Sequence, residues 1–241
     1  MTSGQASSPD EQPQDRPWTD SELDALRASF GLKEEAFLAR ELERPVELVR
    51  EKAAELLAGS PQEGPWSEAD LETLRRYLGG VESELLASML GRSVEDLESK
   101  LVELATSLED TALRGPELIR FKRQFGTRTD EDLAIIFGRT LDRIRAEAAR
   151  LCLSKDKAYT RRRTQGAERT RMPRWTEAEL EQLRQLYPGV SNLEIAQKLG
   201  RSVKSVVSKA HNLGLKKDKA RLEEMGRQNV RLRYDRSAES E

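Results

Sequence analysis

Between positions 173 and 217, hydrophobic residues recur with the spacing of an α-helix in three short stretches, which predicts three amphipathic helices. The first helix begins at a capping pair, Thr176 with Glu179, in which each side chain bonds the other residue's backbone amide. It ends at a Pro-Gly pair, and the second helix ends at Gly200, because proline lacks an amide hydrogen and glycine tolerates a left-handed turn. The third helix carries an apolar stripe at intervals of three, four and three residues, which predicts one buried face. The stripe comprises Val203, Val206, Ala210 and Leu213.

The same pattern recurs three more times upstream, with a constant internal distance. In every copy a large apolar anchor precedes an alanine by 21 residues. A third-helix stripe with the same three, four, three spacing follows each alanine. These agreements predict an all-α chain of four tandem three-helix units. The anchor and alanine pairs are Trp18 with Ala39, Trp66 with Ala87, Leu113 with Ala134, and Trp175 with Ala196.

Two copies depart from the pattern. The first has Glu43 and Pro45 where the fourth has Gly200 and Ser202, which predicts an altered turn and cap. The third has Leu113 in place of tryptophan and an Arg-Gly-Pro sequence at the expected capping position. We interpret the three tryptophans as core residues that pack under the third helices, with base stacking as the alternative.

These features divide the chain into seven segments. The first is a polar, acidic tail that we expect to be disordered. Four units follow, of which the first two are acidic, the third is basic and degenerate, and the fourth matches the pattern best. A basic linker separates the last two units, and a basic, Arg-rich tail ends the chain. The segments are residues 1–16 (tail), 17–60, 61–110 and 111–157 (units one to three), 158–172 (linker), 173–217 (unit four) and 218–241 (tail).

The formal net charge of −2 conceals a strong asymmetry along the chain. Residues 1–112 carry 25 acidic and 11 basic side chains, whereas residues 113–241 carry 18 acidic and 30 basic ones. A basic half of this kind is typical of proteins that meet nucleic acid. The expected partners are therefore double-stranded DNA for the basic half and another protein for the acidic half.

The fourth copy resembles the Myb/SANT-like, homeodomain-like family of helix-turn-helix modules. The resemblance rests on Trp175, the sequence RWTEAEL that contains it, and IAQKLGRSVKSVVSKAHNLGL, and it covers about 45 residues. It implies that the third helix enters the major groove of DNA, as expected of a transcriptional or nucleoid-associated regulator. SANT-like modules also bind protein in place of DNA. A protein-interaction scaffold, or a targeting module of a larger DNA-processing complex, is therefore the alternative.

The exposed positions of the third helices differ in charge. The second copy presents four carboxylates that duplex phosphates would repel, whereas the third and fourth copies present a positive face. In the fourth copy, the basic side chains are expected to neutralise phosphates, and Asn212 and Ser208 to bond base edges. Val207 either contacts a thymine methyl group or completes the core. The predicted DNA-binding residues are Arg201, Ser202, Lys204, Ser205, Val207, Ser208, Lys209, His211, Asn212, Lys216 and Lys217 in the fourth copy, Arg139, Arg143, Arg145 and Arg150 in the third, and Arg161, Arg162 and Arg163 in the linker.

The basic linker has two interpretations. It is either a solvated flexible connection or an arm that lies along phosphates or enters the minor groove.

Other classes of function lack their sequence signatures. Cys152 and His211 are the single cysteine and histidine, so neither an internal disulfide nor a cysteine-rich metal site is possible. We find no Gly-rich phosphate loop, nucleophile elbow or metal-ligand spacing, and therefore expect no enzyme activity, cofactor, metal or small-molecule substrate. No apolar run approaches the roughly 20 residues of a membrane span, and the N-terminus lacks a signal peptide. We expect a protein of the cytoplasm (nucleoid) or nucleus that is not secreted.

Overall fold

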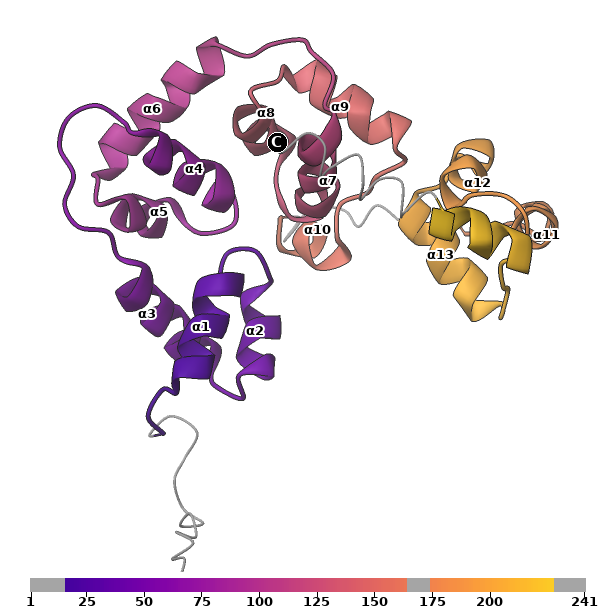
Figure 1. Ribbon diagram of the computed structural model, residues 1–241, viewed down its shortest axis with the longest axis horizontal. Helices are drawn as coiled ribbons and strands as arrows, with labels where there is room; N and C mark the ends of the chain where they lie inside the picture. Colours follow the sequence, from indigo (N-terminus) through magenta and orange to yellow (C-terminus); the bar gives the residue numbers. More distant parts are fainter. Residues whose placement is uncertain (1–15, 164–173, 228–241) are drawn as a thin grey trace, which may run out of the picture. The chain divides into compact units, whose positions relative to one another are not determined.

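The computed structural model describes residues 16–163 and 174–227, and within these ranges the regular structure is helical, without a β-strand (Figure 1). The prediction of an all-α chain is therefore confirmed. The chain divides into two compact units, Met1–Ser107 and Leu108–Glu241. No helix in the described ranges is long and apolar enough to cross a bilayer. The predicted disordered tail lies outside the described residues except for Arg16.

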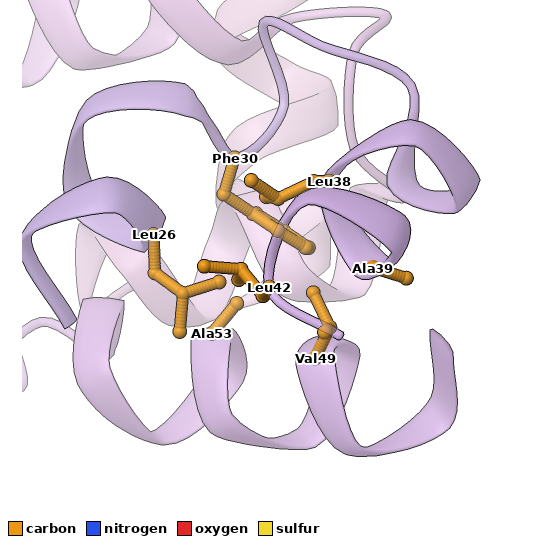
Figure 2. Packing of buried hydrophobic residues seen from close by; sticks show 7 residues of the cluster. All are labelled: Leu26, Phe30, Leu38, Ala39, Leu42, Val49 and Ala53. Atoms are coloured by element: carbon orange, nitrogen blue, oxygen red, sulfur yellow. The ribbon is translucent and has the colours of Figure 1, made fainter. Parts of the chain in front are cut away.

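The first compact unit contains two groups of three helices. Helix α3 packs on α1 and on α2, and helix α5 packs on α4 and on α6. Figure 2 shows the core of the first group, to which all three helices contribute buried side chains. The bounds are α1 (Asp20–Ser29), α2 (Glu35–Glu41), α3 (Val46–Leu57), α4 (Glu68–Tyr77), α5 (Ser83–Leu90) and α6 (Val94–Thr106).

The second compact unit contains two further groups, α7 to α9 and α11 to α13, with α10 between them. Residues 219–227 are helical as well. Because α10 ends at Arg163, the beginning of the predicted linker is a helix, whereas its remainder lies outside the described residues. The bounds are α7 (Gly115–Gln124), the 3-10 helix η1 (Phe125–Thr127), α8 (Asp130–Phe137), α9 (Leu141–Arg150), α10 (Lys157–Arg163), α11 (Glu177–Leu186), α12 (Asn192–Leu199) and α13 (Val203–Asn212).

Short polar side chains fix where most of these helices begin. At five N-termini a Ser or Thr side chain accepts from the amide three residues later, and the acidic residue there accepts from the cap's own amide. Such a cap stabilises a helix by about 1 kcal/mol. Helix α7 differs, as its sequence predicts, because Arg114 makes no side-chain cap and a proline occupies the first turn. The five capping boxes start at Thr19, Ser67, Thr129, Thr176 and Ser191.

One turn geometry joins the second and third helices of all four groups. In each, the amide of an arginine donates to the carbonyl of an alanine five residues earlier, at 2.9 Å. The residue before the arginine has a positive φ, which is 60 to 63° at the glycines but 53° at Glu43. A side chain costs roughly 1–2 kcal/mol in this left-handed conformation, so the first group bears strain that the others avoid. The bonded pairs are Arg44 with Ala39, Arg92 with Ala87, Arg139 with Ala134, and Arg201 with Ala196.

The residues predicted for the core lie there. The four alanines of the repeated pattern are 4%, 2%, 3% and 0% exposed in chain order. The core of α11 to α13 contains Val206, and Val203 and Leu213 pack against it, as the apolar stripe predicts. Trp18 and Trp175 also pack against the cores of their groups, which supports the interpretation of these tryptophans as core residues.

Candidate nucleic-acid interface

The arginine that follows each of these turns reaches back to the start of the first helix. In α1 to α3, the Arg44 side chain is 0% exposed, and its Nε donates to Glu22 Oε1 at 3.0 Å. Its terminal nitrogens donate to the carbonyls of Arg16 and Pro17, each at 2.8 Å. The guanidinium also lies 4.1 Å from the centre of the Trp18 ring, a favourable cation–π distance.

The same ion pair occurs in all four groups, always between residues 22 positions apart. Two of the other three arginines also lie over their group's tryptophan, at 4.6 and 5.1 Å. We call this arrangement the arginine clamp, because it ties the turn before the third helix to the N-terminal end of the first. The remaining pairs are Arg92 with Asp70 at 3.1 Å, Arg139 with Glu117 at 3.2 Å, and Arg201 with Glu179 at 2.8 Å.

The clamp arginine contributes to a lowered pKa at three carboxylates, Glu22, Asp70 and Glu179. The hydrogen bond from Arg44 lowers the pKa of Glu22 to about 2. For Asp70 and Glu179, the backbone amide of the capping residue is the main cause of the lowered pKa, followed by the clamp arginine. These carboxylates are therefore ionised at neutral pH and hold their arginines in place.

Arg139 and Arg201, which the sequence predicts as DNA contacts, are both members of the clamp. Their side chains are only 16% and 12% exposed, and both guanidinium groups are engaged inside their own groups. Sequence reasoning missed the clamp, although its signal was present. A carboxylate stands four residues after every anchor, and an arginine stands 22 residues after every carboxylate.

Helix α13 presents one continuous exposed stripe on the side away from its core. The five exposed residues of this helix fall at intervals of three, one, three and one, which is the spacing of a single helical face. Val207 is 42% exposed, so the alternative that it completes the core is wrong. The stripe carries a lysine, two hydrogen-bonding neutral side chains, an imidazole and one aliphatic side chain, and no carboxylate. We call it the α13 stripe, and it comprises Lys204, Val207, Ser208, His211 and Asn212.

Other predicted residues of this region lie outside the stripe. Ser202 is the N-cap of α13, where its hydroxyl accepts from the amide of Ser205, and both are half-buried. Lys209 is half-buried, with its Nζ 6.0 Å from the centre of the Trp175 ring. Lys217 donates to the Val190 carbonyl, and burial lowers the pKa of its amine. Lys216 is exposed.

The positive face predicted for the third copy is compensated by neighbouring carboxylates. On α9, Arg143 pairs with Asp110 at 2.8 Å, and Arg150 pairs with Glu147 at 2.6 Å. The Nε atom of Arg145 lies 3.6 Å from a carboxylate oxygen of Asp130, the first residue of α8. At the positions of α9 that match the α13 stripe, both arginines are therefore paired with carboxylates, and an exposed aspartate stands beside them. These positions are Asp142, Arg145, Ala146, Ala149 and Arg150.

The acidic third helices expose the equivalent positions, except for the half-buried Ala54 on α3. On α6 the stripe holds three carboxylates, and Val102 is 66% exposed. Asp96, which the sequence placed on this face, instead accepts from Arg92 and from the Trp66 indole. The equivalent residues are Glu95, Glu98, Ser99, Val102 and Glu103 on α6, and Glu47, Arg50, Glu51, Ala54 and Glu55 on α3.

The remaining candidates are in the linker and the tail. Arg161 is exposed on α10, and Arg162 and Arg163 complete that helix. The predicted basic tail carries six acidic and six basic side chains, so its formal charge balances and it is not basic. Cys152 packs against the core of α11 to α13, and burial raises the pKa of its thiol, so it is a structural residue. In the described ranges, no three His, Cys, Asp or Glu side chains are grouped closely enough to hold a metal ion.

Comparison with protein-family models, curated protein sequences and solved structures finds no match. The interpretation of the α13 stripe therefore rests on its own geometry and chemistry.

Proposed function

We propose that this protein binds double-stranded DNA with a sequence preference, and that the α13 stripe is the surface that reads the bases. One observation carries the proposal. Among the four third helices, α13 alone has an exposed stripe without a carboxylate and with side chains suited to both phosphates and base edges. A protein helix of this size fits the major groove, where every base pair presents a distinct pattern of donors and acceptors.

Each stripe residue has a chemical role in this proposal. Lys204, at the N-terminal end, neutralises a phosphate and supplies affinity without sequence information. Asn212 and Ser208 bond base edges, and asparagine is suited to the N6 and N7 atoms of adenine. Val207 contacts a thymine methyl group, which is the apolar feature of the major groove. His211 lies between the polar residues and adds a donor or acceptor. The stripe therefore favours sites that contain A·T base pairs.

We further propose that the four helical groups are tandem copies of one Myb/SANT-like three-helix unit. The arginine clamp with its 22-residue separation supports this, and so does the repeated 2.9 Å bond between arginine and alanine. The clamp joins residues that are 22 positions apart, so it depends on a common arrangement of the three helices, whereas the bond between arginine and alanine reports a common turn. A common ancestor explains this recurrence more simply than four independent origins.

We propose a different role for the two acidic groups of helices, α1 to α3 and α4 to α6. The carboxylates on the exposed stripe of α6 repel duplex phosphates, and the solvent-exposed Val102 lies among them. We assign the first compact unit to contacts with another protein. The whole chain then acts as a transcriptional or nucleoid-associated regulator. The second candidate function is a targeting or scaffold module without base recognition, and the acidic α6 stripe is the observation that favours it.

A stripe exchange in the full-length chain tests the proposal. Replacing Lys204, Val207, His211 and Asn212 by the residues of the matching α6 positions (Glu, Glu, Val and Glu) changes the formal charge by −4 and leaves the core untouched. We expect duplex binding, measured by fluorescence anisotropy with a random-sequence pool at two salt concentrations, to be lost. Circular dichroism checks that the helices persist.

The chain offers a matched control for this exchange. The same α6 residues placed on α9, at positions 142, 145, 149 and 150, also change the formal charge by −4. We expect this control to weaken binding modestly, through long-range charge alone, and to keep the sequence preference. The proposal is overturned if the α13 exchange binds with wild-type affinity and preference. It is also overturned if both exchanges weaken binding equally.

A further inference from the structure

The chain that follows α9 docks against the N-terminal end of α13. The carbonyl of Cys152 accepts from the amide of Val203, the first residue of α13, at 3.0 Å. The Gln197 side chain on α12 donates to the Arg150 carbonyl, also at 3.0 Å. Cys152 packs on the core of α11 to α13 as well. The third group of helices is therefore attached to the fourth where the α13 stripe begins.

Asp156 lies in this same segment, and contacts within the third group hold it in place. Its amide donates to the Gly126 carbonyl at 2.8 Å, and its carbonyl accepts from the Thr160 amide at 2.9 Å. The second bond places Asp156 directly before the first residue of α10. A Cβ atom on Gly126 would stand only 2.7 Å from both carboxylate oxygens, so the carboxylate rests directly against Gly126.

The carboxylate held in this way forms an ion pair with Lys204 Nζ. Lys204 is the first residue of the α13 stripe, and no other lysine or arginine belongs to that stripe. The side chains are 61% exposed for Lys204 and 41% exposed for Asp156, so water and other anions have access to both. Exposed ion pairs of this kind are weak and exchange partners readily.

We propose that Asp156 competes with a DNA phosphate for Lys204 and so lowers the affinity of the α13 stripe for DNA. The proposal rests on the proposed function of that stripe. A phosphate that approaches Lys204 must displace the Asp156 carboxylate, and the displaced carboxylate then repels the same phosphate. Both effects depend on charge, so they weaken at high salt. They leave base recognition unchanged, because a phosphate contact carries no sequence information.

The variant that tests this keeps the helix cap while it removes the charge. Asparagine begins a helix as well as aspartate does, so Asp156→Asn preserves the start of α10. We expect this variant in the full chain to bind a duplex pool about two- to fivefold more tightly at low salt, as the loss of a weak exposed ion pair implies. The gain should shrink at higher salt, and the preferred sequence should stay the same. Asp156→Ser, a second capping residue without charge, should behave alike.

Two further variants separate competition from a general change of charge. Glu177→Gln removes one negative charge from an exposed position in the first turn of α11, and we expect a smaller gain from it. In a Lys204→Gln background, the gain from Asp156→Asn should fall to the level of the Glu177→Gln control. Thermal unfolding confirms that each variant keeps the wild-type fold.

Each possible outcome of these binding measurements either supports or overturns the competition between Asp156 and phosphate. A gain that is specific to Asp156 and depends on Lys204 supports the proposal. Wild-type DNA binding that stays unchanged in both Asp156 variants overturns this inference alone, and so does a gain that persists without Lys204. If the wild-type chain and both variants fail to bind duplex DNA at any salt concentration, the proposed function fails and this inference fails with it.

Discussion

The arginine clamp predicts a large loss of stability from one substitution, Arg44→Ala. The Arg44 side chain is 0% exposed and donates to Glu22 and to the carbonyls of Arg16 and Pro17. Its loss leaves the Glu22 carboxylate, which is 11% exposed, with Arg16 as its remaining charged partner. Breaking a buried pair from one side costs about 3–5 kcal/mol. The cation–π contact with Trp18 adds about 1 kcal/mol. We therefore expect the α1 to α3 group to unfold or to open frequently.

Amide hydrogen exchange of the full-length chain, read peptide by peptide, measures this loss where it occurs. A cost of 3–5 kcal/mol corresponds to exchange about a hundred- to several-thousandfold faster in residues 20–57. Residues 177–212 serve as the internal reference, because their core is separate. Arg27→Ala is the matched control in the same group of helices, since Arg27 is 52% exposed and pairs with the exposed Asp24, so we expect a loss of less than about 1 kcal/mol. Unchanged exchange in residues 20–57 of Arg44→Ala contradicts a structural role for the clamp.

Three further predictions concern single positions. Glu43→Gly should stabilise the α1 to α3 group by about 1 kcal/mol, because glycine adopts a φ of 53° without strain; an unchanged or lower unfolding midpoint contradicts this. Glu22, whose pKa is lowered to about 2, stabilises the fold above its unfolded pKa of about 4.3, and this contribution is lost as pH falls from there toward 2. An acid titration by circular dichroism should therefore show less pH dependence for Glu22→Gln than for wild type, and equal dependence refutes the assignment. Ala196→Asp should unfold α11 to α13, because position 196 is 0% exposed and an unpaired buried carboxylate costs several kcal/mol; retained protection of these helices contradicts its placement.

The helices and their buried faces followed directly from local patterns. Capping pairs such as Thr176 with Glu179 determine where a helix begins, and both members lie within one turn. The three, four, three spacing identified which face of α13 is buried, since that face depends only on helical geometry. The same geometry identified the exposed positions of the α13 stripe, apart from the half-buried Ser205 and Lys209.

The partners of charged residues could not be found in this way. Arg201 follows a glycine at the end of a helix, so the local pattern suits a phosphate ligand as well as a clamp. The choice depends on Glu179, which comes close only when all three helices have packed. Arg143 likewise meets Asp110 from a preceding connection. Helical periodicity tells which side of a helix faces water, and it does not tell which opposite charge another element brings there.

The composition of the linker did not predict the helix at its beginning. Its arginines and threonines suggested an extended, solvated segment, but residues 157–163 form α10. The available signal was Asp156, a helix-capping residue, followed by a run of residues that tolerate a helix. The ion pair between Asp156 and Lys204 then depends on contacts between two groups of helices, which no local pattern reports.

The imidazole of His211 gives the most direct test of base recognition by the α13 stripe. His211 is the single histidine among 241 residues and lies within that stripe, so its NMR signals need no assignment. The full chain should be titrated with a duplex selected from a random-sequence pool, while anisotropy follows binding in parallel. We predict that the imidazole signals move and saturate at the same DNA concentration as the anisotropy, while the indole signal of Trp66 stays in place. If the anisotropy saturates and the His211 signals remain at their free positions, α13 does not face the DNA, and base recognition by the α13 stripe is refuted.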